Sequence, residues 1–122
     1  MKSWRINGLS MKKNLEIFLA NILESIDEIE SYTQDATEKD FLQSHIMQDA
    51  VMRRLEIIGE AVRNIPMSFR NQHENIPWKK IAGIRDILIH EYFSVDIGLV
   101  WEIVQKDIPK LKSDIVALLN DL

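Results

Sequence analysis

Residues 14–29 read NLEIFLANILESIDEI, and the spacing of the apolar residues in this stretch decides the fold class. The apolar residues recur at steps of four, three, four and three, at Leu15, Leu19, Ile22, Ile26 and Ile29. Such spacing places one apolar stripe along a helix of about 3.6 residues per turn. The stretch therefore predicts a long amphipathic helix over residues 12–32.

A second apolar stripe begins after a polar loop over residues 33–37. Thr37 and Asp40 have the spacing of an N-terminal capping box. The stripe that follows consists of Met47, Val51, Leu55, Ile58, Val62 and Ile65. We expect this second helix to end at Ile65, because a residue before a proline avoids the α-helical backbone conformation.

A connector over residues 66–77 is expected to hold one short helical turn. A third helix then runs over residues 78–91 or 78–93, with Pro77 in its first turn, where the missing N–H costs nothing. Gly83 either weakens this helix by about 1 kcal/mol relative to alanine or allows another helix to approach closely.

The fourth helix is expected to begin after Ser94 or Asp96, either of which can cap it. Pro109 interrupts the helical pattern and should kink the helix near Gln105. The apolar stripe of this helix consists of Ile97, Val100, Val104, Ile108, Leu111, Ile115, Leu118 and Leu122. Together the stripes predict an all-α fold, an antiparallel bundle of four main helices plus a short helical connector.

The bundle is expected to occupy residues 12–122 as one domain. Residues 1–11 carry no periodic pattern and are expected to form a flexible N-terminal extension, with Met11 an alternative start. The chain has no cysteine, which excludes disulfides and thiolate chemistry and suits a reducing cytoplasm. Neither a signal peptide nor an apolar run long enough to span a membrane is recognised.

The charge is unevenly distributed along the chain. The net charge is −4, yet residues 53–85 hold seven basic side chains against three acidic ones. This basic middle either attracts a phosphate chain or is simply a solvated helix face. His-Glu-x-x-His, Glu-x-x-His and glycine-rich phosphate-binding motifs are all missing, so we expect neither a metal nor a cofactor.

The third helix holds the candidate chemistry in the segment WKKIAGIRDILIHEYF, residues 78–93. His90 is either a proton-transfer group or a favourable partner for the helix dipole. At about 100° per residue, Arg85 and Tyr92 share one side of the helix, whereas Arg85 and His90 point roughly 140° apart. Unwinding near His90, a curled arginine, or a second copy of the chain would bring the two side chains together.

These residues resemble the HEPN superfamily, whose signature is an arginine, a polar residue, three further residues and a histidine. Here the signature is Arg85-Asp86-Ile-Leu-Ile-His90, and its extension to Tyr92 is similar to the HepT-like toxin branch. The segments 55–61, 76–83 and 95–101 resemble those that flank the motif in such proteins. The resemblance spans about residues 14–118.

The resemblance implies a homodimeric helical bundle that cleaves RNA without a metal ion, in a type VII-like toxin–antitoxin system. It implies Arg85 and His90 as catalytic residues, supported by Asp86 and Tyr92. It also implies a minimal nucleotidyltransferase as the antitoxin partner, which in some relatives transfers AMP to the motif tyrosine. In this chain that tyrosine is Tyr92.

Several residues keep two interpretations. Asp86 either orients the site or is an ordinary salt-bridging residue, and Tyr92 either contacts RNA or packs in the core or an interface. Lys79 and Lys80 either contact RNA phosphates or serve solubility, and Glu60 either is structural or approaches the cleft. Two rival functions also stay open: a non-catalytic HEPN module that binds RNA, a nucleotide or the nucleotidyltransferase, and an adaptor bundle.

Overall fold

The computed structural model describes residues 7–91 and 94–122, with side chains from residue 11 onward. Within these ranges the chain forms seven α-helices and one π-helical turn, and it contains no strand. The expected all-α class is thus confirmed. No helix of the described residues is both long and apolar enough to cross a membrane.

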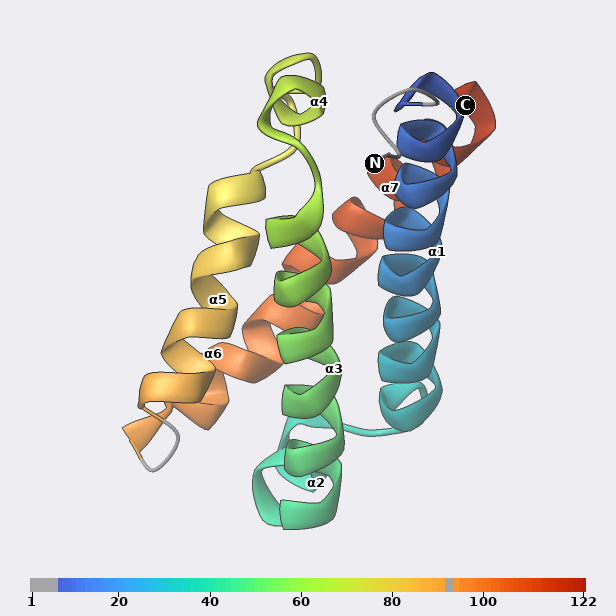
Figure 1. Cartoon of the computed structure of the whole chain (residues 1–122). Helices are drawn as coiled ribbons and strands as arrows, with labels where there is room; N and C mark the ends of the chain where they lie inside the picture. The colour runs from blue at the N-terminus through green and yellow to red at the C-terminus, as the bar shows by residue number, and fades with distance from the viewer. Residues whose placement is uncertain (1–6, 92–93) are drawn as a thin grey trace.

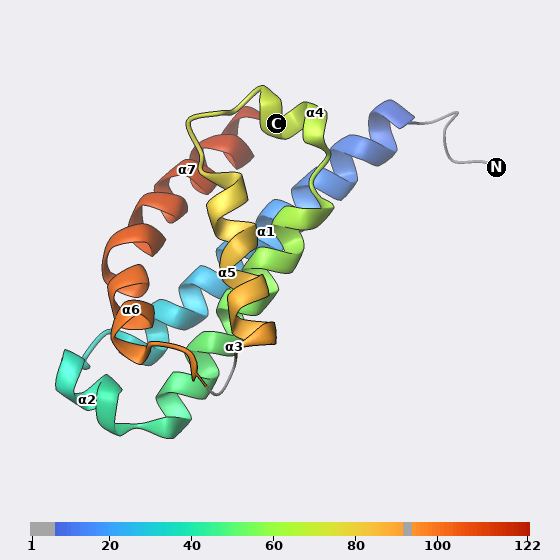
Figure 2. The same ribbon diagram turned by 90° about the vertical axis from the view of Figure 1, so that its left-hand side faces the viewer.

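Four main helices run antiparallel to their neighbours (Figures 1 and 2). They are α1 (Asn7–Thr33), α3 (His45–Asn64), α5 (Trp78–His90) and α7 (Ile108–Asp121). Helix α3 is central, because α1 packs against one side of it and α5 against the other, while α7 packs against α1. The expected antiparallel bundle is present.

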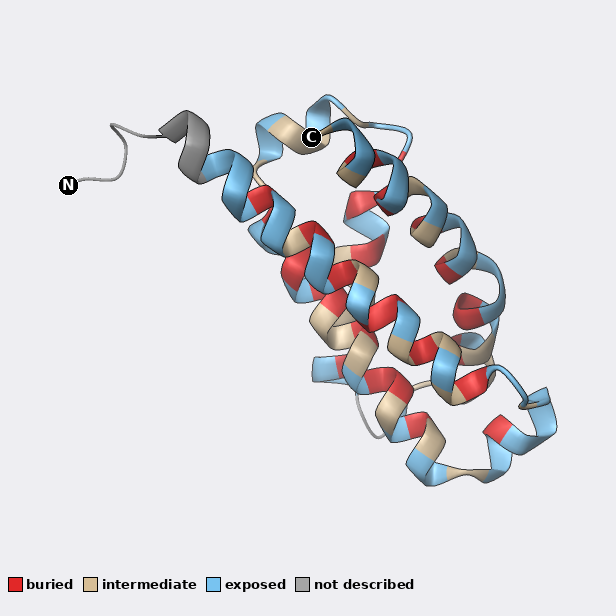
Figure 3. Ribbon diagram, turned by 90° about the vertical axis from the view of Figure 1, so that its right-hand side faces the viewer, coloured by how far each residue is buried: buried red, intermediate tan, exposed pale blue. Residues whose placement is uncertain are grey.

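On the main helices, the buried residues lie mainly along the side of the ribbon that is turned toward the other helices (Figure 3). The predicted stripes supply most of them, including Leu19, Ile22, Ile26, Ile29, Val51, Leu55, Ile58, Val62, Ile108, Leu111, Ile115 and Leu118. Burying a side chain of this size contributes about 1.5–3 kcal/mol. On α7, Lys112 adds ion pairs to Asp27 (3.4 Å) and Glu30 (2.7 Å) of α1. Hydrogen bonds from the Lys112 ammonium group to Glu30 and, with a smaller effect, to Asp27 raise the pKa of Lys112 above its ordinary value.

The second helix is not continuous, contrary to expectation. A short helix, α2 (Glu38–Gln43), precedes α3, and Ser44 between them has an extended backbone. The predicted capping box of Thr37 and Asp40 begins α2. The break is stabilised by Gln48, whose Nε2 donates to two carbonyl oxygens at the end of α2, those of Phe41 (2.9 Å) and Leu42. It places the buried ring of Phe41 against Trp101, 5.3 Å away between centroids.

Other boundaries lie near their expected positions. Helix α1 begins at Asn7, within the range 1–11 that was expected to form an extension, and residues 1–6 lie outside the described ranges. The connector holds α4 (Met67–Asn71). Asp96, rather than Ser94, caps α6 (Ile97–Glu102) by accepting from the Leu99 N–H. The expected kink is a π-helical turn, η3 (Ile103–Asp107), which leads into α7.

The close approach between helices occurs at Gly59 of α3, not at Gly83. A Cβ atom built on Gly59 would overlap the Cβ of Arg85 on α5 and lie 3.3 Å from the carbonyl oxygen of Ile81. A Cβ built on Gly83 would meet no atom within 4 Å. The absence of a side chain at Gly59 therefore lets α3 pack closely against α5 at the backbone of Arg85.

We predict opposite effects for alanine at the two glycines. Gly59→Ala should lower the free energy of unfolding by about 1–3 kcal/mol, because α5 has to move away from α3. Gly83→Ala should raise it by up to about 1 kcal/mol, since alanine is the better helix former and nothing blocks its methyl group. Chemical denaturation followed by circular dichroism measures both. Equal effects at the two positions would contradict the close approach.

Candidate functional site

Helix α5 holds the motif on a regular helical backbone. The helix is continuous to His90, and the N–H of Glu91 still donates to the carbonyl oxygen of Ile87 at 2.9 Å. Trp78, Ile81 and Leu88 are its buried residues. They fix how α5 is rotated on α3 and therefore the direction in which Arg85 points.

Arg85 lies where α5 crosses Gly59, and its side chain is only 27% exposed. Its Nε lies 3.1 Å from Oε1 of Glu60 on α3, and its Nη1 lies 3.4 Å from Oδ1 of Asp86. The guanidinium is thus held from two sides. Nη2 has no partner among the described residues, so part of this rigid fork of donors is available for a ligand.

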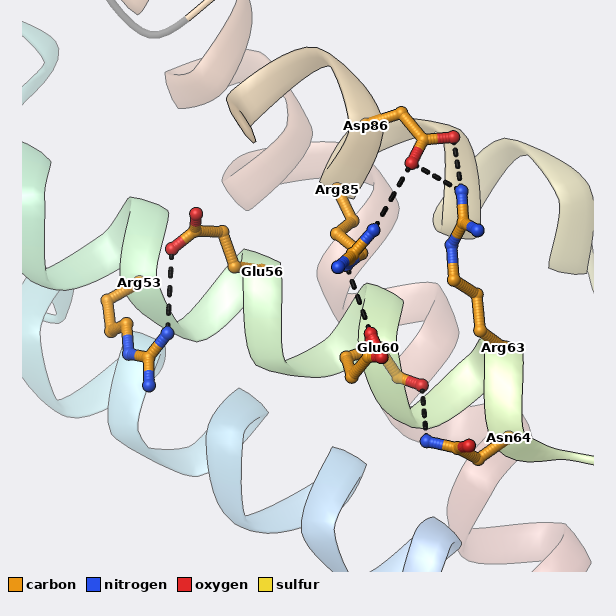
Figure 4. A network of polar contacts seen from close by, with 7 residues as sticks. All are labelled: Arg53, Glu56, Glu60, Arg63, Asn64, Arg85 and Asp86. Carbon is orange, nitrogen blue, oxygen red and sulfur yellow. Dashed lines mark hydrogen bonds and ion pairs between the residues drawn. The ribbon is translucent and has the colours of Figure 1, made fainter. Parts of the chain in front are cut away.

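Asp86 joins two arginines (Figure 4). Both of its carboxylate oxygens accept from Nη2 of Arg63, which lies on the last turn of α3. The result is a row of alternating charges, Glu60, Arg85, Asp86 and Arg63, across α3 and α5. These contacts fit both interpretations of Asp86, an orienting role for Arg85 and an ordinary salt-bridging role. No hydrogen bond between Asp86 and His90 is found within the described residues.

The side chain of Arg85 lines a groove between α1, α3 and α5, here called the Arg85 groove. The groove has a volume of about 440 Å³. Phe18, Ile57 and Ile89 give it apolar walls, and its polar residues include Asn21, Arg53, Glu56, Glu60 and Asn64. Ile89 lies in the same groove as Arg85, as the helical periodicity predicts for that side of α5.

His90 lies outside the Arg85 groove. Its side chain is exposed on the last turn of α5, and no hydrogen bond or ion pair to it is found within residues 7–91 and 94–122. The structure therefore does not bring Arg85 and His90 together within one chain. Within the described residues α5 stays helical up to His90, and Arg85 contacts Glu60 on α3.

The two lysines differ in their surroundings. Lys80 Nζ pairs with Oδ1 of Asp107 at 3.3 Å, which ties α5 to the π-helical turn. Lys79 is exposed and has no charged partner in the part of the chain that the structure describes. Tyr92 lies outside the described residues. No group of three histidine, aspartate or glutamate side chains arranged for a metal ion occurs within the described ranges.

Residues 22–118 match the family model described as "Ribonuclease HepT-like". The chain belongs to the HepT-like ribonuclease family. It is 47% identical over 102 residues to the Thermococcus cleftensis protein named "Probable ribonuclease HepT", covering 84% of this chain and 93% of the relative. The sequence resemblance to this branch is thus confirmed.

Relatives of two lengths are found in Methanocaldococcus jannaschii. One, provisionally named an RNase, is 43% identical over 104 residues, 85% of this chain and 95% of the relative. Another, named a gamma-glutamylcyclotransferase and, provisionally, an RNase, is 57% identical over 112 residues. This match covers 92% of the chain but only half of that relative. No solved structure matches the chain.

For this HepT-like chain, sequence reasoning left Glu60 undecided and missed Arg63. Both lie on α3 three residues apart, and this spacing places them on one face of the helix. The adjacent pair Arg85 and Asp86 has the complementary order of charges. The sequence does contain a signal for these ion pairs: an acidic and a basic residue three positions apart on one helix, and an adjacent basic and acidic residue on another. Pairing the two patterns requires knowing that α3 packs on α5.

Proposed function

We propose that this protein is a metal-independent endoribonuclease and the toxin of a type VII-like toxin–antitoxin system. The observation that carries the proposal is Arg85, a guanidinium held in an open groove on the helix that ends at His90. Membership of the HepT-like ribonuclease family supports RNA as the substrate. The cytoplasm, which holds both RNA and AMP donors, is the expected location.

The proposed reaction is an internal attack by the RNA itself. His90 removes the proton from a ribose 2′-hydroxyl, and the 2′-oxygen forms a bond to the adjacent phosphorus. Arg85 donates hydrogen bonds to the phosphate oxygens while negative charge accumulates on them. The bond from phosphorus to the 5′-oxygen breaks, and a general acid protonates that oxygen. The products are a 2′,3′-cyclic phosphate and a 5′-hydroxyl end, and no metal ion is required.

A second copy of the chain supplies the missing proximity. Within one chain Arg85 lies in the groove while His90 is outside it. A two-fold dimer that covers the end of α5 would place His90 of one protomer beside Arg85 of the other. It would also cover Ile87 and Ile89, which are 47% and 43% exposed.

The proposed antitoxin is a minimal nucleotidyltransferase that transfers AMP to Tyr92. Tyr92 follows His90 by two residues. An attached AMP adds bulk and a negative phosphate close to the position where the RNA phosphate has to bind, so like charges would repel the substrate. Neutralisation of this kind requires neither unfolding nor loss of the dimer.

We expect the purified protein to cleave cellular RNA in the presence of EDTA and to leave cyclic-phosphate ends. Arg85→Ala and His90→Ala should each abolish cleavage, because one removes the charge on the phosphate and the other the proton acceptor. Gel electrophoresis and end-group analysis measure both results. Helical content and oligomeric state, checked by circular dichroism and light scattering, should be unchanged.

Lys106→Ala is a matched control, because Lys106 pairs with Glu102 by a surface contact on another helix. Cleavage that persists in both motif variants, or that EDTA stops, would contradict the proposal. The non-catalytic module that binds RNA, nucleotide or partner would then be the better description. A preparation without activity is informative only if mass spectrometry shows unmodified Tyr92.

A site shared between protomers predicts that two inactive variants restore each other. Co-expressed Arg85→Ala and His90→Ala chains should regain about a quarter of wild-type cleavage, because half of the random dimers are mixed and each keeps one intact site of two. The rate of RNA cleavage by the mixture, compared with each variant alone, measures this. No recovery in mixtures shown to contain mixed dimers would place the site within one chain.

Modification by the cognate nucleotidyltransferase and ATP should add AMP to Tyr92 and stop cleavage. Tyr92→Phe should escape the modification, since it lacks the acceptor hydroxyl, and therefore stay active in the presence of the antitoxin. Peptide mass spectrometry locates the added AMP, and the EDTA-resistant cleavage assay reports its effect. Modification of Tyr32 instead, the other tyrosine of the chain, would contradict the assignment.

A further inference from the structure

A second hollow lies beside the catalytic helix, and nothing described so far occupies it. It is formed by the last turn of α3, by α4, by the loop after α4 and by the start of α5, and it has a volume of about 800 Å³. We propose that this hollow, here called the flanking hollow, binds the RNA segment next to the cleaved bond. The proposal rests on the proposed function and adds the course of the substrate strand.

Arg63 connects the flanking hollow with the charged row that holds Arg85. Arg63 lines the hollow, and its guanidinium pairs with the carboxylate of Asp86 that also contacts Arg85 (Figure 4). Along α5, Lys79 precedes Arg85 by six residues, which is about 9 Å of helix. Lys79 and Arg85 also point roughly 120° apart around the helix, so a strand with one phosphate at Arg85 has to pass over the Arg63–Asp86 pair to reach the hollow.

The hollow is lined by an excess of positive charge. Four basic residues line it, against one acidic residue, Glu74. The charges of Arg63 and Lys80 are already balanced by Asp86 and Asp107, so the excess comes from Arg70 and Lys79. A nucleic-acid strand is attracted to such a surface chiefly through its phosphates. The excess is notable because the whole chain has a net charge of −4, so attraction of RNA has to be local.

Arg70 is already oriented toward this use. Its Nε donates to the carbonyl oxygen of Ile65 at 3.1 Å, across the turn between α3 and α4. This bond fixes the stem of the side chain and leaves the terminal Nη groups without partners among the described residues. An arginine fixed in advance loses less side-chain entropy when a phosphate binds than a freely moving one.

Apolar side chains provide a surface for a base. Met67, Pro77 and Ala82 line the hollow beside the basic residues, and Met67 is 59% exposed. An exposed methionine is adaptable and fits ring surfaces of different shape. Phosphate contacts together with an unspecific apolar surface favour a single strand of no fixed sequence.

A comparison of the neighbouring Lys79 and Lys80 distinguishes a defined RNA-binding track from a surface that is basic in general. Lys79 has no charged partner among the described residues, whereas Lys80 is paired with Asp107. Lys80 also lines an apolar cavity on the other side of α5, between α5 and α7. The proposal assigns a phosphate contact to Lys79 and none to Lys80, although the sequence alone gave both lysines the same interpretations.

The test measures binding separately from cleavage. A fluorescently labelled 2′-O-methyl oligoribonucleotide lacks the nucleophilic hydroxyl, so anisotropy reports only its binding to the full-length protein. Lys79→Ala and Arg70→Ala should each weaken binding about three- to tenfold and lower the salt dependence by about 0.7 in the log–log slope. Lys80→Ala should leave both values close to wild type.

Each outcome separates the flanking hollow from the catalytic proposal. Equal effects of Lys79→Ala and Lys80→Ala, or no effect of Lys79→Ala and Arg70→Ala, would overturn the hollow as the RNA track even if Arg85→Ala abolishes cleavage. Binding that depends on Lys79 and Arg70, in a protein that cleaves no RNA, would support the track and reject the nuclease. A wild type that does not bind the oligoribonucleotide would overturn the track.

Discussion

The packing of α3 on α5 at Gly59 is the contact on which the candidate site depends. Because Gly59 has no side chain, the backbone of α3 lies directly against the Cβ of Arg85. That distance lets Glu60 reach the guanidinium and lets Arg63 reach Asp86. A larger side chain at position 59 would separate the two helices and lengthen every contact in the charged row. One small residue in the core side of a helix therefore sets the geometry of four charged residues at the surface.

The charged row contributes more to position than to stability. Glu60, Arg63 and Asp86 have side chains that are 51%, 43% and 42% exposed, and ion pairs this exposed are worth about 0–1 kcal/mol. Their effect is to hold Arg85 in one orientation while its charge is balanced by two carboxylates. A bound phosphate would compete with Glu60 for the same guanidinium. The two carboxylates of the row balance its two guanidinium groups. Without a bound phosphate the row therefore has no net charge, in a protein whose overall charge is negative.

The sequence predicts the helices well because each depends on its own periodicity. The stripes of α1, α3 and α7 are buried as expected, and the caps at Thr37 and Asp96 follow from local side-chain chemistry. The break at Ser44 was not predictable, because Gln48 and the ring contact of Phe41 with Trp101 stabilise it across elements. The role of Arg63 was missed for the same reason: pairing with Asp86 joins residues 23 positions apart.

The separation of Arg85 from His90 follows from the helix itself. Five residues of regular α-helix turn the side chains roughly 140° apart, and α5 stays regular through His90. Arg85 is also held by Glu60 on the side of α3. The dimer proposed above is one arrangement that brings Arg85 and His90 to the same phosphate. An enzyme built in this way is inactive as a monomer, so its activity depends on protein concentration as well as on chemistry.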